Sequence, residues 1–233
     1  MSPDTLQLPL GVGARDDVTF ASFWPGANAG LVSHLHHQLD DGGEQFIYLW
    51  GASGSGRTHL LQAACLEASN RGARALYLPL DDLGHFPPHM LEDLEALDLI
   101  AIDDLERVIG RKRWEEALFH CFNRLRDANC RLIIAAEASP RALPVVLPDL
   151  ASRLGWGMTF HLQPLNDQDR LEVLRLRAHQ RGMQLPDEVA RYLLHRGPRR
   201  LGDMLALLTR LDSASLSAQR RLTIPFVKQA LDW

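Results

Sequence analysis

The sequence has little lysine, little cysteine and no long apolar run. Only two of its 25 basic residues are lysines, Lys112 and Lys228, which we attribute to the base composition of the genome rather than to a site. The three cysteines, Cys65, Cys121 and Cys130, include no Cys-x-x-Cys pair, which is typical of buried apolar residues in a reducing compartment. No apolar run approaches the ~20 residues of a membrane span, and the N-terminus lacks the basic and apolar regions of a secretory signal. We therefore expect a cytosolic protein that does not enter a membrane.

The chain has 233 residues, more than one average domain and fewer than two. Apolar residues make up 46% and charged residues 23%, which is an ordinary globular balance. The net charge of −4 argues against a general nucleic-acid binder. Residues 1–150 carry 12 basic and 21 acidic side chains, whereas residues 151–233 carry 13 and 8. This asymmetry indicates two parts with different partners, or one part that brings cations to an anionic ligand, or only compositional noise.

Hydrophobic patterns divide the chain at about residue 164. Strands and helices alternate before it, which predicts a parallel α/β sheet. The expected strands are residues 46–50, 73–78, 97–102, 131–136 and a short one at 158–162, and the expected helices are residues 28–39, 57–69 and 111–127. Helical periods alone follow, at residues 167–181, 186–195, 201–211 and 225–231. We therefore expect a tail at residues 1–15, an α/β domain at 16–163 and a helical domain at 164–233.

A glycine-rich segment lies between the first expected strand and the next helix. Residues 51–58 read Gly-Ala-Ser-Gly-Ser-Gly-Arg-Thr, which fits the phosphate-loop pattern except that Arg57 replaces the usual lysine. Such glycines let backbone N–H groups meet phosphate oxygens, and the helix N-terminus adds a positive dipole end. The Thr58 hydroxyl would ligate Mg²⁺. Arg57 keeps the charge in another shape, so we expect diphosphate binding to survive and hydrolysis to be less efficient. A turn without a ligand is the alternative.

Acidic side chains follow two further expected strands. Asp103 and Asp104 end the strand at 97–102, where phosphate-loop proteins hold Mg²⁺. Asp103 would reach the metal through water, and Asp104 would orient an attacking water. Glu137 follows the strand at 131–136 and would approach the γ-phosphate, although an ionised carboxylate is only an acceptor. Structural turns remain the alternative for all three.

Two arginines in the basic part are candidates for phosphate contacts. Arg153 lies in the segment Leu147–Leu154, just before the helical part, and would serve as an arginine finger on a neighbour's nucleotide. Arg199 precedes a helix of the helical part and would contact the nucleotide phosphates from above. From spacing alone, a surface salt bridge is the more common role for such an arginine.

In this order, these motifs resemble the AAA+ family, and within it the branch of the bacterial replication initiator DnaA. The match is closest to the regulatory inactivators of that branch. It rests on residues 20–26 (Phe-Ala-Ser-Phe-Trp-Pro-Gly), the phosphate loop with its Arg57, residues 147–154 and residues 222–228. The resemblance covers nearly the whole chain, and an arginine in the loop is typical of these inactivators. It implies an AAA+ core with a small helical lid, without the DNA-reading domain that initiators carry after the lid.

The resemblance implies roles for particular residues. Phe23, within residues 20–26, would line the adenine pocket, Arg153 would act in trans on nucleotide held by DnaA, and Arg199 would be the sensor-2 residue of the lid. Glu137 stands at sensor 1, where the family prefers Asp, Asn, Ser or Thr. The expected ADP or ATP site, with Mg²⁺ at Thr58 and Asp103, comprises Phe23, Gly51, Ser53, Gly54, Ser55, Gly56, Arg57, Thr58, Asp103, Asp104, Glu137 and Arg199.

The N-terminal segment resembles the peptide by which such inactivators bind the β sliding clamp of DNA polymerase III. Gln7, Leu8 and Leu10 match that peptide, although Gly11 stands where a final Pro or Phe is expected. An extended peptide of this kind docks in an apolar groove.

The resemblance implies a bacterial cytoplasmic protein that reaches DNA only through the clamp at the replisome, binds no membrane and is able to form homodimers or larger oligomers. It would stimulate ATP hydrolysis by DnaA, with little turnover of its own. The alternatives are an AAA+ ATPase with its own turnover, and a DnaA-like adaptor without clamp binding.

Overall fold

The computed structural model describes residues 18–40 and 42–233, which form two compact units. Unit 1 includes Gly30–Gly51 and Gly56–Leu162, together with the described residues up to Phe20. Unit 2 comprises Ala21–Ala29, Ala52–Ser55 and Gln163–Trp233. The segment with Gln7, Leu8 and Leu10, the expected clamp-binding peptide, lies outside the described residues.

Unit 1 is built around a five-stranded sheet in the order β2-β3-β4-β1-β5. The four pairings between neighbouring strands are all parallel. The strands are β1 (Phe46–Trp50), β2 (Ala75–Pro79), β3 (Leu99–Asp103), β4 (Arg131–Ala136) and β5 (Met158–His161). The predicted α/β class with a parallel sheet is confirmed. Because the strands are parallel, their carboxyl ends share one edge of the sheet, where ligands of such folds bind.

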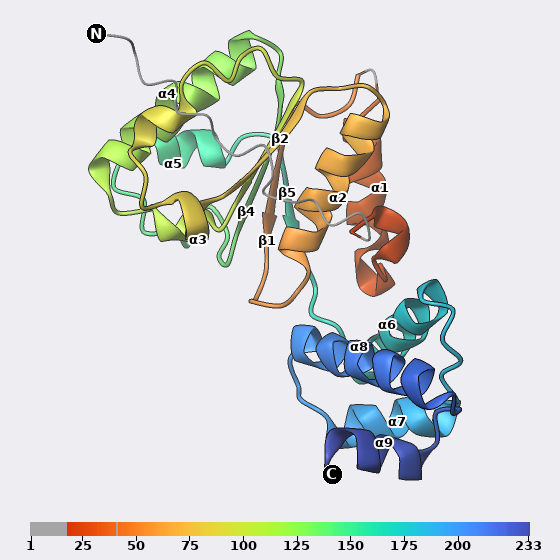
Figure 1. Cartoon of the computed structure of the whole chain (residues 1–233). Helices are drawn as coiled ribbons and strands as arrows, with labels where there is room; N and C mark the ends of the chain where they lie inside the picture. The colour runs from red at the N-terminus through yellow and green to blue at the C-terminus, as the bar shows by residue number, and fades with distance from the viewer. Residues whose placement is uncertain (1–17, 41) are drawn as a thin grey trace, which may run out of the picture. The chain divides into compact units, whose positions relative to one another are not determined.

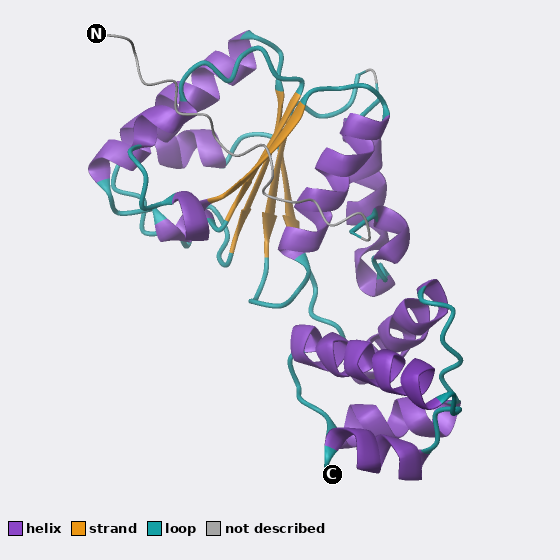
Figure 2. Ribbon diagram, viewed as in Figure 1, coloured by secondary structure: helices purple, strands orange, loops and turns teal. Residues whose placement is uncertain are grey.

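Helices cover both faces of this sheet (Figures 1 and 2). One face carries α1 (Ala29–Gln38) and α2 (Arg57–Asn70), and the other carries α3 (Leu80–Leu83), α4 (Lys112–Asp127) and α5 (Pro148–Leu154). Covered on both faces, the central strands are apolar throughout rather than alternating. The apolar face of α4 is turned to the core, since Trp114, Leu118, Phe122 and Leu125 are all buried.

Two strand starts differ from the prediction because of one carboxylate. We expected strands from residues 73 and 97, but β2 begins at Ala75 and β3 at Leu99. The Asp98 side chain accepts a hydrogen bond from the Arg74 backbone N–H at 2.7 Å, which joins the two segments just before β2 and β3 begin. Short Asp side chains compete in this way with ladder hydrogen bonds.

Helices also differ from the prediction, among them the one-turn helix α3 (Leu80–Leu83), which was not predicted. Helix α5 (Pro148–Leu154) was not predicted as a helix, because one apolar turn bounded by Pro148 and Gly155 has no measurable period. Helix α8 (Leu201–Ala218) runs past the expected end at residue 211. Its last turns contain three serines, so hydrophobic periodicity does not mark them as helix, and there the Ser217 hydroxyl donates to the Ser213 carbonyl at 2.8 Å.

Unit 2 is a small helical bundle formed by α6 (Asp167–Gln180), α7 (Asp187–Arg196), α8 and α9 (Ile224–Leu231). Leucines and other apolar side chains of all four helices form its core. Asn166 begins α6 with a capping box, in which its side chain and that of Asp169 each accept a backbone N–H of the other. Trp24, from the early segment of unit 2, donates its indole N–H to Asp169 at 3.1 Å.

The three cysteines are buried and unpaired. Burial raises the pKa of the Cys65 and Cys121 thiols to about 12 and that of Cys130 to about 11. Among the described residues, no helix has the length and apolarity needed to cross a membrane.

Candidate functional site

The phosphate-loop segment connects the end of β1 to the start of α2. Gly54 and Gly56 have φ angles of +78° and +104°, which side chains rarely tolerate, so glycine is required at both places. The buried Gly51 donates its N–H to the Ala136 carbonyl of β4 at 3.2 Å. The Ser55 N–H turns back to the Ala52 carbonyl at 3.1 Å. The segment therefore has the tight backbone that a phosphate loop needs, with Ser53 and Gly54 exposed.

Asp103 is fully buried at the carboxyl end of β3. One carboxylate oxygen accepts hydrogen bonds from the Thr58 hydroxyl at 2.6 Å and from the Tyr77 hydroxyl at 2.9 Å. The other oxygen accepts the Asp104 N–H at 3.0 Å. The structure therefore brings together Thr58 and Asp103, which are 45 residues apart.

Tyr77 was missed by the sequence analysis. It lies on β2, whose neighbour in the sheet is β3. Burial and the adjacent Asp103 carboxylate raise the pKa of its phenol, so Tyr77 stays a hydrogen-bond donor at neutral pH. The order of the strands decides this contact, and no local pattern in the sequence indicates it.

Arg57 is buried, with only 7% of its side chain exposed, and faces several carboxylates. Its Nη2 lies 3.5 Å from Asp104, 3.8 Å from Glu106 and 3.7 Å from Glu137. We call these three carboxylates the acidic cluster. The Nη1 atom of Arg57 is also buried, and it has no hydrogen-bond partner among the described residues. A buried guanidinium with an unsatisfied donor fits a phosphate oxygen.

Asp104 has an unusual backbone and an unusual carboxyl group. Its φ angle is +54°, in the left-handed region that Asp and Asn adopt more readily than most residues. Burial raises its pKa to about 6, and the Asp103 and Glu106 carboxylates add to this, while Arg57 opposes it. Proton exchange near pH 6 is compatible with a role beside a reacting water.

Glu106 and Glu137 belong to one connected group. Glu106, which was missed by the sequence analysis, lies in the turn Leu105–Arg107 directly after β3 and accepts the Glu137 N–H at 3.1 Å. Glu137 follows β4, and 52% of its side chain is exposed. The expected sensor-1 residue is therefore close to Arg57, although its role stays a prediction.

The residues that would hold Mg²⁺ are few. Within residues 18–40 and 42–233, no group of three or more His, Cys, Asp or Glu side chains is arranged to hold a metal ion. The Thr58 hydroxyl and an Asp103 carboxylate oxygen lie 2.6 Å apart and would offer two oxygens to such an ion. Mg²⁺ commonly takes one or two protein oxygens and completes its shell with water and phosphate, so the pair fits such an ion when nucleotide is present.

Arg153 lies in the last turn of α5, in unit 1. Its Cζ is 4.3 Å from the centre of the Trp156 ring. In the described part of the chain no carboxylate lies within salt-bridge distance of Arg153, so the surface salt bridge considered from the sequence is not seen there. This guanidinium keeps its charge available on the surface of unit 1.

The other end of α5 is held by a buried glutamate. Glu115, in the first turn of α4, is fully buried and accepts the backbone N–H groups of Val146 and Leu147 at 2.6–3.1 Å. It also accepts the Gly110 N–H at 2.8 Å. These bonds fix the chain where α5 begins, so the helix that carries Arg153 is attached to α4. The sequence gives no sign of this role.

Two expected nucleotide contacts belong to unit 2. Arg199 is exposed just before α8, and Phe23 is partly buried in the segment Ala21–Ala29. Within unit 2, Arg199 and Arg200 line a cavity of about 420 Å³ together with the loop residues Ala52–Ser55. Arg199 and loop residues thus share one cavity, whose lining does not include Phe23.

Comparisons with known proteins agree with this architecture. Residues 15–161 match the family described as "Bacterial DnaA ATPAse domain", and residues 167–231 match the one described as "Hda, lid domain". Domain III of the Thermotoga maritima replication initiation protein DnaA is similar in structure, with a TM-score of 0.79 and 23% identity over 94% of this chain and 97% of that one.

Two further solved structures are similar. AMPPCP-bound DnaA from Aquifex aeolicus has a TM-score of 0.68 and 27% identity, covering 78% of this chain and 61% of that one. The RuvB Holliday junction branch migration motor of Thermotoga maritima has a TM-score of 0.66 and 17% identity, covering 89% and 68%. The predicted AAA+ core with a helical lid is confirmed. The chain belongs to the bacterial DnaA ATPase-domain family, and its lid is of the Hda type.

Proposed function

We propose that this protein is a regulator of replication initiation that makes DnaA hydrolyse its ATP. In this proposal it binds ADP or ATP with Mg²⁺, is attached to the DNA-loaded β sliding clamp, and presents Arg153 to the nucleotide of DnaA. Initiation would then be switched off once replication has begun. The protein would act in the bacterial cytoplasm, near the nucleoid, and touch DNA only through the clamp.

Adenine-nucleotide binding is supported by family membership and by the loop geometry. The family is named for an ATPase domain, and the Aquifex aeolicus relative was solved with AMPPCP. In this chain, the Arg57 guanidinium would bind phosphate, and Thr58 with Asp103 would hold Mg²⁺. The bound ion would neutralise phosphate charge.

The observation that carries the proposal is the state of Arg153. Its guanidinium has no carboxylate partner among the described residues and lies against an aromatic ring at the end of a helix that α4 holds. An arginine supplied in trans stabilises the charge that develops during phosphoryl transfer and is worth ~10³–10⁵ in rate. The match of residues 167–231 to the family described as "Hda, lid domain" supports the same proposal.

The assignment of Arg153 as an arginine finger can be tested in a reconstituted assay with clamp, DNA and ATP-loaded DnaA. The assay measures the rate of ATP hydrolysis by DnaA. Arg153→Ala should lower the stimulated rate by ~10³-fold or more. Arg141→Ala is the matched control, because Arg141 is an exposed arginine of the same unit outside α5. If Arg153→Ala stimulated DnaA as well as the unchanged protein, the assignment would be wrong.

Clamp attachment is tested separately by pull-down on the β clamp. Gln7→Ala should abolish retention, because the glutamine of such a peptide makes its polar contacts. Thr5→Ala, in the same segment but outside the peptide, should leave retention unchanged. Equal retention of both variants would favour the alternative of a DnaA-like adaptor without clamp binding.

An AAA+ ATPase with its own turnover is the second candidate, and the position of Asp104 after β3, 3.5 Å from Arg57, favours it. Against it, Arg57 replaces the usual lysine and is surrounded by the acidic cluster, which weakens its pull on a transferring phosphate. Steady-state ATPase activity of the purified protein, alone and with DNA, separates the two. We expect a rate far below that of the stimulated DnaA reaction.

A further inference from the structure

We propose that Trp156 is a positioning residue for Arg153: its indole ring holds the guanidinium in the orientation in which it reaches a partner's nucleotide. This inference rests on the proposed function of Arg153. The ring centre lies 4.3 Å from Arg153 Cζ, well within the distance at which a guanidinium is attracted to the face of an indole. Tryptophan is the best side chain for such an interaction.

The backbone fixes where Trp156 starts. Its N–H donates to the Arg153 carbonyl at 3.0 Å, closing the turn that ends α5. The next residue, Gly157, has a φ of +71°, and a Cβ there would collide with the carbonyl oxygen of Phe46 on β1. Only glycine fits this close approach. Trp156 is therefore placed by the sheet itself.

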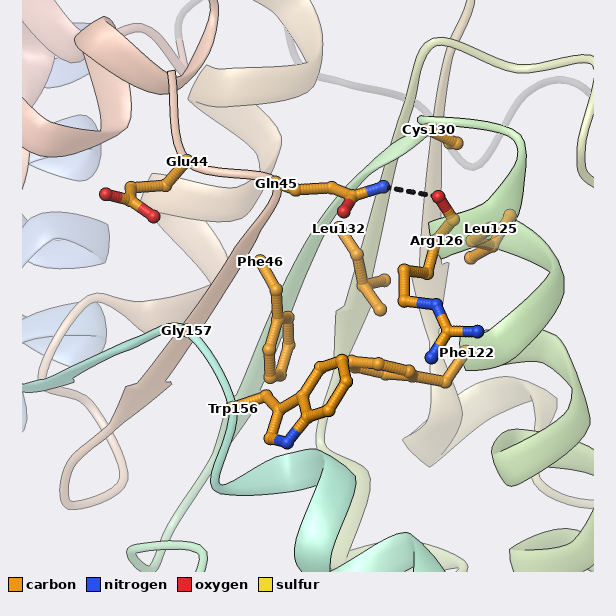
Figure 3. A pocket seen from close by; sticks show the side chains of 10 residues that line it. All are labelled: Glu44, Gln45, Phe46, Phe122, Leu125, Arg126, Cys130, Leu132, Trp156 and Gly157. Carbon is orange, nitrogen blue, oxygen red and sulfur yellow. Dashed lines mark hydrogen bonds between the residues drawn. The ribbon is translucent and has the colours of Figure 1, made fainter. Parts of the chain in front are cut away.

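Aromatic neighbours fix the ring of Trp156. The Phe122 ring of α4 meets it edge-on, with centroids 6.4 Å apart, and meets the Phe46 ring edge-on at 5.0 Å. Figure 3 shows these three side chains together at one end of a pocket. The pocket has a volume of about 140 Å³, and Leu125 and Leu132 add apolar surface to it. Edge-to-face geometry is favourable for aromatic pairs, so the ring has a defined orientation.

The position of Trp156 at the surface separates this role from simple core packing. The ring is 45% exposed, although it meets the buried Phe122 ring, so one part of it is open to the Arg153 guanidinium. A second guanidinium, that of Arg126, lies 5.7 Å from the ring centre, but its Nη2 is bound to Asp127 at 2.7 Å. Arg153 is the arginine beside the ring without such a carboxylate among the described residues.

The physical effect is a reduction of side-chain freedom. A free arginine loses rotamer entropy when it is fixed in one orientation. Stacking on Trp156 imposes part of that order before the partner binds. The charge is kept, because an aromatic face stabilises a cation without neutralising it. A carboxylate in the same place would instead compete with the partner's phosphates.

The test is the stimulated DnaA reaction with Trp156→Leu, Trp156→Met and Trp156→Phe. Leucine and methionine keep apolar volume but have no aromatic face, so the maximal rate should fall roughly 2- to 30-fold. The concentration for half-maximal stimulation should stay within about 2-fold, because the ring would act on the reaction and not on docking. Phenylalanine should restore most of the rate. Phe86→Leu is the matched control, since Phe86 is an exposed aromatic of the same unit, at 47%.

A double-mutant cycle shows whether Trp156 acts through Arg153. In the Arg153→Ala background, Trp156→Leu should have no further effect. A further loss there would overturn the inference, because the ring would then contact the partner itself. An unchanged rate for Trp156→Leu in the otherwise unchanged protein would overturn it too.

The stack is also measurable without any partner. In NMR spectra, the Arg153 Nε–H resonance should carry a ring-current shift that Trp156→Leu removes and Trp156→Phe keeps. Urea unfolding midpoints will identify variants that fail to fold. If Trp156→Leu is one of them, Trp156→Met is used in its place. If Arg153→Ala had no effect on DnaA while the ring-current shift was present, the proposed function would fail although the stack exists. If the shift were absent from the unchanged protein, the positioning role would be wrong.

Discussion

Two arginines of unit 1, Arg57 and Arg153, have opposite kinds of surroundings. Arg57, at the carboxyl edge of the sheet, is buried and faces the three carboxylates of the acidic cluster. Arg153, at the end of α5, lies on an aromatic ring with no carboxylate nearby in the described part of the chain. A carboxylate neutralises a cation, whereas an aromatic face only orients it. In the proposed function, Arg57 binds a nucleotide phosphate within this chain, and Arg153, with no carboxylate among the described residues to compete for it, would meet the phosphates of a partner's nucleotide.

Among the variants that test this comparison, we expect the largest loss of stability from replacing Glu115, whose carboxylate holds the start of α5. Glu115→Ala should lower the free energy of unfolding by about 3–5 kcal/mol, because it leaves buried backbone N–H groups without acceptors. Glu116→Ala is the control: its carboxylate is 46% exposed and 3.8 Å from Lys112, so about 0.5 kcal/mol or less is expected. Urea unfolding measures both. Similar losses for the two variants would show that Glu115 does not anchor the helix.

Gly157→Ala should disturb the aromatic side of the same region. The added Cβ collides with the Phe46 carbonyl oxygen at a positive φ, so we expect a loss of about 2–3 kcal/mol in unfolding free energy. Gly72→Ala has a similar φ of +85° but no atom within 4 Å, and should lose about 1 kcal/mol. Differential scanning calorimetry measures the loss of stability in both variants. Folded Gly157→Ala protein should still bind nucleotide, since the acidic cluster is untouched.

Arg57→Ala should weaken nucleotide binding at the carboxyl edge of the sheet and leave the region around Arg153 unchanged. Loss of its charge-assisted hydrogen bonds should weaken ADP binding by about 10- to 100-fold in isothermal calorimetry. Arg71→Ala, near the opposite end of α2 with exposed partners, should leave ADP binding unchanged. Arg57→Lys keeps the charge and should retain most of the affinity. Equal affinity of Arg57→Ala and the unchanged protein would remove Arg57 from the binding site.

Asp104→Asn should give a smaller effect than these variants, with a distinctive dependence on pH. The pKa of Asp104 is about 6 in the folded chain, above the ordinary 3.8. Its contribution to stability is therefore full below pH 3.8 and is lost as the pH rises through 6. Asparagine tolerates the positive φ, so the variant should be more stable than the unchanged protein by about 1–2 kcal/mol above pH 7, and this gain should shrink toward pH 4.

Asp98→Asn should change the pH dependence of stability in the direction opposite to Asp104→Asn. Hydrogen bonds from Arg74 lower the pKa of Asp98, so this carboxylate stabilises the fold above its ordinary pKa and loses that contribution in acid. The exposed site should make the effect small. Urea midpoints from pH 4 to 8 for both variants complete the comparison. Parallel pH curves would contradict the assignment of Asp104 as a destabilised, buried acid.

The sequence was sufficient where a motif is local. Gly54, Gly56 and Arg57 occupy a strand-turn-helix segment whose conformation depends on its own residues, and the strand before Asp103 is marked by its apolar run. The proximity of Thr58 and Asp103 also follows, because parallel strands end at the same edge. For such features, order along the chain and arrangement in space are directly related.

The sequence was insufficient where a contact depends on packing between distant elements. Tyr77 meets Asp103 because β2 lies next to β3, and Glu115 reaches α5 across about 30 residues. In the sequence, nothing distinguishes Trp156 from the other aromatic residues. Its position depends on the Phe122 ring and on the close approach of Gly157 to β1. The roles of Phe23 and Arg199 rest on the family resemblance and remain predictions.

The three buried thiols make this chain convenient for site-directed labelling. With pKa values of about 11–12, Cys65, Cys121 and Cys130 present almost no thiolate to a maleimide at pH 7. A cysteine introduced at Val146, which is 65% exposed and lies two residues before the start of α5, would therefore be modified selectively. A fluorophore or spin label there would report on the approach of a partner to Arg153 without first removing any native cysteine.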